Sequence, residues 1–183
     1  MQTIILGSSS ITRAQLLEKF GVPFEQRDAG FDEEQLHIKE PAHFVYHATK
    51  GKMQSYLAKY PLDKPVLCAD TVVTAEGQIL RKAKDVKDAR RILELQSGNQ
   101  VSIITCMIYK SNDFEMIDLA STEYLFAPFS KEALDAYLQS DEWKGKAGAC
   151  MVEGFCKSYI QAVRGLESTA MGLSVERLLP FLK

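Results

Sequence analysis

The sequence is poor in the residues that mark several protein classes, and each shortage excludes one of them. Cysteine occurs four times in 183 residues and never as a C-x-x-C pair, which argues against structural zinc and against a disulfide framework. All four (Cys68, Cys106, Cys150 and Cys156) stand among apolar or small residues, so we expect small buried hydrophobic side chains. Only 11 glycines and 6 prolines are present, too few for a collagen-like or low-complexity chain.

The chain also lacks long apolar runs and an excess of positive charge. No stretch approaches the ~20 apolar residues of a membrane span, and residues 1–7 carry no charged segment of a signal peptide. We therefore expect a cytoplasmic protein with no membrane partner. Lys and Arg number 22 against 24 Asp and Glu, for a net charge of −2, which argues against nucleic acid as the main partner. The length predicts a single domain over residues 1–183.

Three familiar site motifs are missing as well. The sequence contains neither the P-loop pattern G-x-x-x-x-G-K-[ST] nor the dinucleotide pattern G-x-G-x-x-G. His43 and His47 have the spacing of a metal pair, but no Glu follows His43 as in H-E-x-x-H. We interpret these histidines, with His37, as surface residues.

What the chain does contain is an alternation of helical and extended segments. The patterns predict strands over residues 3–7, 22–27, 65–74, 101–109, 115–126 and 158–163. They predict helices over residues 11–20, 41–59, 86–96, 130–139 and 174–182. Helices and strands alternate early and strands adjoin late, which indicates an α/β fold with α+β character and a partly antiparallel sheet.

Asp70 stands out because it interrupts the apolar strand of residues 66–73. A carboxylate in such a strand is costly unless it is paired, hydrogen-bonded or bound to a metal. A solvated strand face is the alternative, but Cys68 and Val72 would share that face, so the alternation is poor. The pattern therefore favours a functional carboxylate.

Other charged residues have ordinary explanations when taken singly. Lys52 continues the apolar stripe of Phe44 and Ala48, and its spacing alone favours a lysine whose stem packs while its ammonium reaches water. Glu33 in the acidic run 32–34, and Lys82 in the basic run 81–84, are typical of solvated segments.

The turn at residues 7–10 precedes a helix and could hold a phosphate on its backbone N–H groups. Ser8 and Ser10 lie in this turn, and Arg13 follows in the first helical turn, where its guanidinium could bind the same phosphate. A simple serine cap is the commoner explanation of such a turn.

The order of these motifs along the chain resembles the Maf family of nucleoside triphosphate pyrophosphatases, also described as septum-formation inhibitors. Residues 8–17 resemble its opening S-x-S-P-R-R-x-x-L-L, and residues 69–73 resemble its A-D-T-x-V. Further matches are residues 32–33, 52–53, 80–83, 95–98 with Thr105, 146–154 and 171–173. The ordered set spans almost the whole chain.

This resemblance implies an elongated, bent mixed sheet flanked by helices, with two lobes and a deep substrate cleft. It implies hydrolysis of a nucleoside triphosphate to a monophosphate and pyrophosphate with a divalent metal cation, Mg²⁺ or Mn²⁺. Glu33 and Asp70 would hold the metal, with Asp70 as the base that activates water. Lys52 and Lys82 would complete the catalytic group, and Ser8, Ser10 and Arg13 would bind phosphate.

Substrate choice in this family is linked to three positions, which here are Thr12, Thr71 and Glu153. The group that hydrolyses dTTP and UTP tends to carry Arg, Thr and Gln there, and the group that acts on 7-methyl-GTP tends to carry an aromatic residue, Gln and Glu. The present combination of Thr, Thr and Glu is a mixture.

Function is therefore expected to be pyrophosphatase activity that cleans the nucleotide pool. The alternative is a non-catalytic regulator of septum formation that binds nucleotide or nucleic acid, and a third reading is an inosine triphosphate pyrophosphatase of related architecture. Asp70, Glu33, Lys52 and Lys82 favour the enzyme, since binding alone does not need a positioned base. The expected partner is the nucleoside triphosphate, and a homodimer remains open as the assembly.

Overall fold

The computed structural model describes residues 1–28 and 30–182, and the chain divides into two compact units. The first unit comprises Met1–Thr71, Ile104–Ser121 and Leu166–Lys183, and the second comprises Val72–Ile103 and Thr122–Gly165. The strands β3 (Val66–Ala75), β5 (Gln100–Lys110) and β6 (Glu115–Phe126) each begin in one unit and end in the other. That the whole chain acts as one domain stays a prediction.

A mixed sheet of seven strands confirms the predicted α/β class. Its strand order is β2-β1-β3-β5-β6-β7, and β4 pairs with β3 outside this path. Parallel pairs join β1 to β2 and to β3, whereas the β3–β4 and β6–β7 pairs are antiparallel. The remaining strands are β1 (Ile4–Leu6), β2 (Phe24–Gln26), β4 (Gln78–Leu80) and β7 (Ile160–Arg164).

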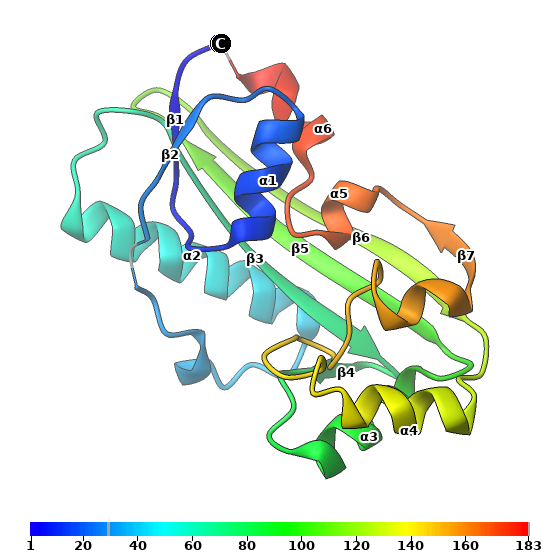
Figure 1. Ribbon diagram of the computed structural model, residues 1–183. Coiled ribbons are helices and arrows are strands. Elements are labelled where there is room, and N and C mark those ends of the chain that lie inside the picture. The colour runs from blue at the N-terminus through cyan, green and yellow to red at the C-terminus, as the bar shows by residue number, and fades with distance from the viewer. Residues whose placement is uncertain (29, 183) are drawn as a thin grey trace. The chain divides into compact units, whose positions relative to one another are not determined.

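In the first unit, α1 (Ile11–Lys19) and α2 (Pro41–Lys59) cover opposite faces of the sheet (Figure 1). Strand side chains alternate between the two faces, so Leu67 and Ala69 pack on the α1 face, and Val66 and Cys68 pack on the α2 face. A short helix, α6 (Val175–Leu178), also contributes to the α1 face. This alternation decides which helix each residue in the middle of β3 meets.

The ends of the first two helices follow local rules visible in the sequence. Ser10 caps α1, since its side chain accepts the backbone N–H of Arg13 at 3.4 Å. Gly21, just beyond that helix, has a φ of 68°, a conformation that favours glycine. Pro41 occupies the first turn of α2, where its missing N–H costs nothing. Both predicted helices are confirmed to within one residue.

In the second unit, α3 (Val86–Gln96) and α4 (Lys131–Gln139) lie side by side (Figure 1). Asp85 and Ser130 cap these helices through their side chains, as predicted. A cluster of aromatic rings packs beside α4, formed by Phe126, Phe129, Tyr137, Phe155 and Tyr159. These rings contact one another and add apolar burial to this unit.

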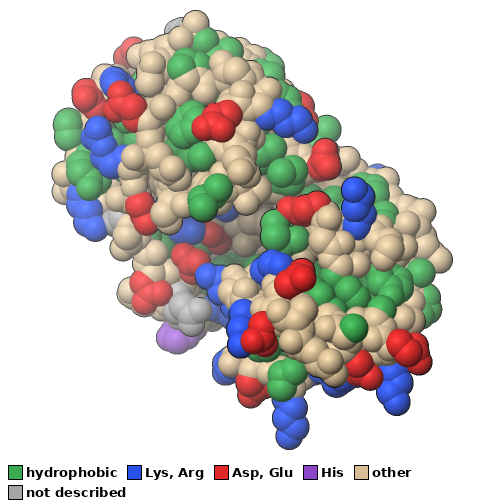
Figure 2. Space-filling model, viewed as in Figure 1, with side chains coloured by type: hydrophobic (Ala, Val, Ile, Leu, Met, Phe, Trp, Pro, Cys, Tyr) green, Lys and Arg blue, Asp and Glu red, His purple; other side chains and the backbone are tan. Residues whose placement is uncertain are grey.

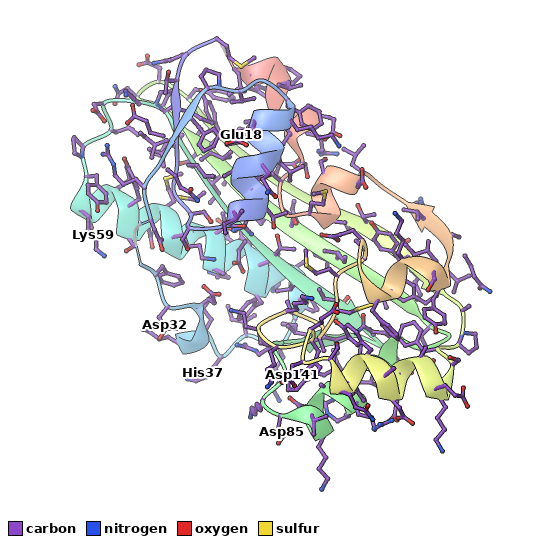
Figure 3. The ribbon with its side chains drawn as sticks, in the orientation of Figure 1. Glu18, Asp32, His37, Lys59, Asp85 and Asp141 are labelled. Atoms are coloured by element: carbon purple, nitrogen blue, oxygen red, sulfur yellow. A yellow bond between two sulfur atoms is a disulfide. The ribbon has the colours of Figure 1, made fainter. Side chains whose placement is uncertain are left out.

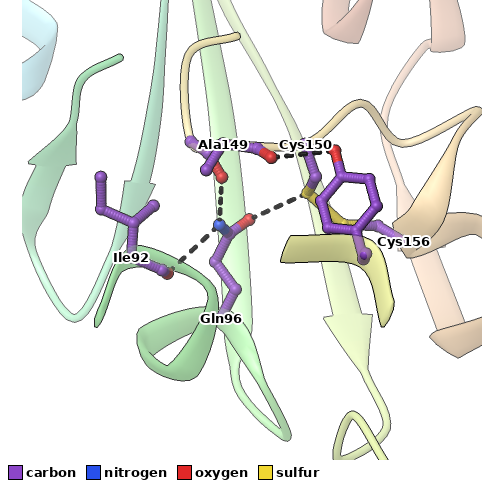
Figure 4. Close-up of a disulfide and its surroundings, with 7 residues drawn as sticks. Ile92, Gln96, Ala149, Cys150 and Cys156 are labelled. Carbon is purple, nitrogen blue, oxygen red and sulfur yellow. Dashed lines mark hydrogen bonds between the residues drawn. A yellow bond between two sulfur atoms is a disulfide. The ribbon is translucent and has the colours of Figure 1, made fainter. Parts of the chain in front are cut away.

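Two of the four cysteines depart from the prediction. Cys68 and Cys106 are buried thiols as expected, and burial raises their thiol pKa values to about 12 and about 11. Cys150 and Cys156, by contrast, form a disulfide (Figure 4). A turn in which Gly154 N donates to Met151 O at 3.0 Å brings their Cα atoms within 6.6 Å. Nothing in the local composition indicates this turn, so the expectation of four buried thiols was wrong for this pair.

The C-terminal segment also differs from the single helix expected over residues 174–182. The helix α6 ends at Leu178 and a 3-10 turn, η3 (Leu179–Phe181), follows. Pro180 accounts for the break, because proline lacks the N–H that a continuing helix would use. A second short helix, α5 (Glu167–Ala170), was not predicted.

Charges of both signs are interspersed over the face of the molecule shown in Figure 2, in keeping with the net charge of −2. None of the helices in the described part of the chain is long and apolar enough to cross a membrane.

Candidate active site

The candidate site begins where β3 leaves the first unit's core. Asp70 and Thr71 are consecutive residues of this strand, so their side chains point to opposite faces of the sheet. Asp70 follows Val66 and Cys68 onto the α2 face, and Thr71 follows Leu67 and Ala69 onto the α1 face. Each face supplies one cation: Lys52 from α2 meets Asp70, and Arg13 from α1 meets Thr71.

On the α2 face, Lys52 joins two carboxylates. Its Nζ lies 2.5 Å from Asp70 Oδ1 and 3.3 Å from Glu33 Oε2. The Asp70 side chain is 8% exposed and that of Lys52 is 17% exposed, whereas the Glu33 side chain is 41% exposed. The Lys52 side chain is therefore mostly buried, and its ammonium contacts two carboxylates where the spacing had favoured a solvated ammonium.

Burial and charge act in opposite directions on Asp70. Removal from water disfavours the carboxylate, and this effect is the largest, so the pKa of Asp70 is raised above its ordinary value. The Lys52 ammonium opposes that rise, and Arg13 opposes it more weakly. A carboxylate of raised pKa, held by a cation in the middle of a buried strand, has the properties of a general base.

Glu33 belongs to a 3-10 turn, η1 (Glu33–Gln35), that interrupts the long connection between β2 and α2. Asp32 and His37, labelled in Figure 3, flank this turn and point away from the sheet. All three histidines are exposed, as predicted. The Glu33 carboxylate, in this acidic run, lies 3.3 Å from Lys52 Nζ.

On the α1 face, the guanidinium of Arg13 is buried and held at each of its three nitrogens. Nε donates to Gly172 O at 3.0 Å, Nη1 to Ser8 Oγ at 3.1 Å, and Nη2 to Thr71 Oγ1 at 3.1 Å. Burial lowers the pKa of Arg13, and the nearby Asp70 and Glu33 carboxylates oppose this effect. A guanidinium has five N–H groups, so these bonds leave one on each terminal nitrogen for a ligand.

The serine turn is organised around this arginine. Ser8 Oγ accepts from Arg13 and also from the backbone N–H of Ser10 at 3.2 Å. Gln26 of β2 holds the turn from outside by donating to Ser8 O at 2.7 Å. Ser10 serves as the helix cap, and Thr12, the next predicted specificity residue, is half-buried on α1. The structure thus joins Ser8, Arg13 and Thr71 into one hydrogen-bonded group.

Two predicted residues belong to the second unit. Lys82 is exposed and forms an isolated antiparallel bridge with Ala147, in the segment that carries the K-A-G motif. Glu153 is exposed and lies within the loop that the Cys150–Cys156 disulfide closes. The two residues before this loop are held by α3 and α4, since Gln96 Nε2 donates to Gly148 O at 2.6 Å and Tyr137 Oη donates to Ala149 O at 3.0 Å (Figure 4).

Within the described residues, no group of three or more His, Cys, Asp or Glu side chains is arranged to hold a metal ion. The pair of Asp70 and Glu33 is nevertheless a suitable donor set, because both carboxylates converge on a single cation, the Lys52 ammonium. Mg²⁺ commonly uses one or two carboxylates together with substrate phosphates and waters. The two carboxylates therefore fit a divalent cation.

Sequence reasoning assigned no role to two residues that contact the site. Gly172 supplies the carbonyl that receives Arg13 Nε, and Thr105 Oγ1 lies 2.9 Å from Thr71 Oγ1. Both fall within the motifs noted above, but their partners are 159 and 34 residues away along the chain. No local pattern could have indicated these contacts.

Comparison with known proteins extends these observations. A family model described as Maf-like protein matches residues 3–183. A nucleoside triphosphate pyrophosphatase of a Nitratiruptor species is 56% identical over 182 residues, which cover 98% of each chain. Proteins of the same name are 37% identical over 180 residues in Helicobacter pylori (strain J99 / ATCC 700824) and 35% identical over 182 residues in Campylobacter jejuni subsp. jejuni serotype O:23/36 (strain 81-176). These two matches cover 98% of this chain, and 95% and 100% of the respective relatives.

Proposed function

The chain belongs to the Maf family, and from this premise we propose that it hydrolyses a nucleoside triphosphate between its α- and β-phosphates. The products are a nucleoside monophosphate and pyrophosphate. Similarity to relatives named nucleoside triphosphate pyrophosphatase over 98% of the chain supports the reaction class. The observation that carries the assignment of residues is the buried Asp70 carboxylate beside Lys52.

In this mechanism Asp70 accepts a proton from the attacking water. The oxygen of that water forms a bond to the α-phosphorus while the bond to the bridging oxygen breaks, and pyrophosphate leaves. Burial favours the protonated form of Asp70 and so strengthens it as a base, whereas Lys52 keeps it ionised before the reaction. These opposing effects suit a group that must be a carboxylate at rest and an acid after attack.

The phosphates carry several negative charges, and the chain offers cations to offset them. Arg13 has one N–H on each terminal nitrogen beyond its bonds to Ser8, Thr71 and Gly172. A fork of this kind suits two phosphate oxygens, and the backbone N–H groups of the serine turn add further donors. Lys52 and Lys82 complete the set of cations that we assign to the triphosphate.

We assign a divalent cation, Mg²⁺ or Mn²⁺, to Glu33 and Asp70. When bound, the cation would lower the charge on the phosphates and acidify a water molecule. The convergence of both carboxylates on the Lys52 ammonium supports this assignment, because it shows that Asp70 and Glu33 can face a single positive charge together.

The non-catalytic alternative finds no comparable support. A regulator that only binds nucleotide or nucleic acid does not need a buried carboxylate with a raised pKa, and such a group costs stability. On the face that Figure 2 shows, charges of both signs are interspersed, which disfavours nucleic acid as a partner of that face. We propose that the enzyme acts on the nucleotide pool of the cytoplasm, where it would remove non-standard or excess nucleotides.

Release of pyrophosphate from a panel of nucleoside triphosphates tests the proposal. The purified chain should release pyrophosphate, and not orthophosphate, from at least one nucleotide. A chelator should abolish the release, and Mg²⁺ or Mn²⁺ should restore it. Full activity in the chelator would disprove the metal assignment alone, whereas inactivity with every nucleotide and metal would disprove the enzyme.

A further inference from the structure

We infer that Thr105 is a positioning residue for Arg13, acting through Thr71 in a closed ring of hydrogen bonds. This inference rests on the proposed function, because it assigns Arg13 to the triphosphate. We name this group the Arg13 ring: the guanidinium of Arg13, the hydroxyls of Thr71 and Thr105, the carbonyl of Thr169 and the backbone of Gly172.

Each bond of the ring has ordinary hydrogen-bond geometry. Arg13 Nη2 donates to Thr71 Oγ1 at 3.1 Å, which lies 2.9 Å from Thr105 Oγ1. Thr105 Oγ1 donates to Thr169 O at 2.7 Å, and the same carbonyl accepts Gly172 N at 3.1 Å. Gly172 O then accepts Arg13 Nε at 3.0 Å, which closes the ring.

The direction of every proton in the ring follows from these partners. A carbonyl can only accept, so the Thr105 hydroxyl donates its proton to Thr169 O. Thr105 therefore accepts from Thr71, and Thr71 accepts from Arg13. Thr71 has no proton left for a ligand, and towards a substrate its oxygen is only an acceptor.

Apart from the half-buried Thr71, the residues of the ring are buried, which makes the loss of its hydrogen bonds costly. Thr105 and Thr169 are each 1% exposed and Arg13 is 8% exposed. Deleting the Thr105 hydroxyl would leave the Thr71 proton without its acceptor and one lone pair of the Thr169 carbonyl without its donor. Thr71 would then be free to turn, and Arg13 would lose a fixed partner on one side of its guanidinium.

The backbone conformation of Gly172 and its lack of a Cβ also suit it to the Arg13 ring. Its φ is 108°, a conformation that side-chain-bearing residues rarely adopt. A Cβ at this position would meet Arg13 Nε at 3.2 Å and Thr71 Oγ1 at 3.4 Å. Because Gly172 has no Cβ, its carbonyl can come close enough to the guanidinium to accept the hydrogen bond from Arg13 Nε.

The test replaces Thr105 with Val, which keeps the shape and removes the hydroxyl. Misplacement of a phosphate-binding group should lower kcat/KM for nucleotide hydrolysis by about 10- to 100-fold, equally for every nucleotide. Thr105→Ser should retain most of the activity. Thr74→Val is the matched control. Thr74 is also a buried threonine on a strand, and its hydroxyl donates to a backbone carbonyl, Ser102 O, at 3.1 Å.

A double substitution separates positioning from simple structural support. If Thr105 acts through Thr71, then Thr105→Val should cost less than about twofold in a Thr71→Val background, because the ring is already open. Equal losses in both backgrounds would overturn the inference. So would a folded Thr105→Val protein with wild-type activity, or a Thr74→Val protein that loses as much.

Thermal unfolding identifies a Thr105→Val protein that does not fold. In that case Thr71→Ser and Thr71→Val carry the test, with activity retained by Ser and lost by Val to the same extent for all nucleotides. A change in the nucleotide ranking alone would show that Thr71 only reads the base, and would overturn the ring. Failure of the proposed function is distinct from all these results, because the wild type itself would then be inactive.

Discussion

At the scale of single residues, Asp70 is costly to bury as a carboxylate and is also the base that we assign to the reaction. Asp70→Asn preserves the shape but can neither accept a proton nor hold a cation as strongly. We expect turnover to fall by about 10²- to 10⁴-fold with the fold retained. Turnover from pyrophosphate release and secondary structure from circular dichroism check this, and a folded variant with near wild-type turnover would contradict it.

The raised pKa of Asp70 also predicts how stability depends on pH. A carboxyl whose pKa is higher in the folded chain contributes stability at low pH, and the contribution is lost as the pH rises through the folded pKa. At pH 7 the ionised Asp70 therefore costs stability. We expect Asp70→Asn to be at least as stable as the wild type at pH 7, and the difference between them to shrink in acid. Urea unfolding across this range measures it, and a variant clearly less stable at pH 7 would show that the Lys52 pair outweighs burial.

Glu153 makes a prediction about the base of the substrate. Its carboxylate is only an acceptor, as is the Thr71 oxygen towards a ligand. Guanine offers a ring N–H and an amino group to an acceptor, whereas uracil and thymine offer one N–H between two carbonyls. We expect guanine-type or modified nucleotides to be preferred over dTTP and UTP, helped by the small Thr12.

Glu153→Gln should shift this preference toward pyrimidines, because the amide both donates and accepts. The nucleotide panel measures kcat/KM for wild type and variant side by side. The argument from Glu153 fails if the wild type prefers dTTP or UTP and the substitution leaves the ranking unchanged.

At the scale of elements, the loop of residues 148–156 is held both by its disulfide and by bonds to α3 and α4. We expect Cys156→Ser to lower the free energy of unfolding by about 2 kcal/mol, the chain-entropy cost of opening a short closed loop. A reductant should destabilise the wild type by the same amount and leave the variant unaffected.

Thiol titration of the unfolded chain is the direct control for this disulfide. Without reductant it should detect the two free cysteines, Cys68 and Cys106, and after reduction all four. Four thiols in the unreduced protein would show that Cys150 and Cys156 are not paired.

At the scale of the whole molecule, two lysines far apart in the sequence, Lys52 and Lys82, are assigned to triphosphate charge. Lys52 belongs to the first unit and Lys82 to the second. If both act on triphosphate charge, Lys52→Ala and Lys82→Ala should each lower kcat/KM by about 10²-fold for every nucleotide alike. Lys50→Ala and Lys84→Ala, at exposed positions two residues away, are the matched controls. A loss confined to one base would mean that the lysine reads the base instead.

The sequence by itself determined the longer helices and strands, the fold class and the family. Caps such as Ser10, Asp85 and Ser130 act within one helical turn, so their effect depends only on adjacent residues. Asp70 could likewise be identified from adjacent residues, because a carboxylate within an apolar run is visible in the sequence without knowledge of its partner. The order of motifs along the chain identified the family, which the match over residues 3–183 confirms.

Only the tertiary structure decided which of these residues meet. Spacing favoured a solvated Lys52, and the register of α2 on the sheet places it against Asp70 instead. The Cys150–Cys156 pair depends on a turn, and the Arg13 ring joins residues up to 159 positions apart. Such contacts depend on how strands and helices pack. Packing is decided by the whole chain at once, so no local stretch of sequence contains the information that determines them.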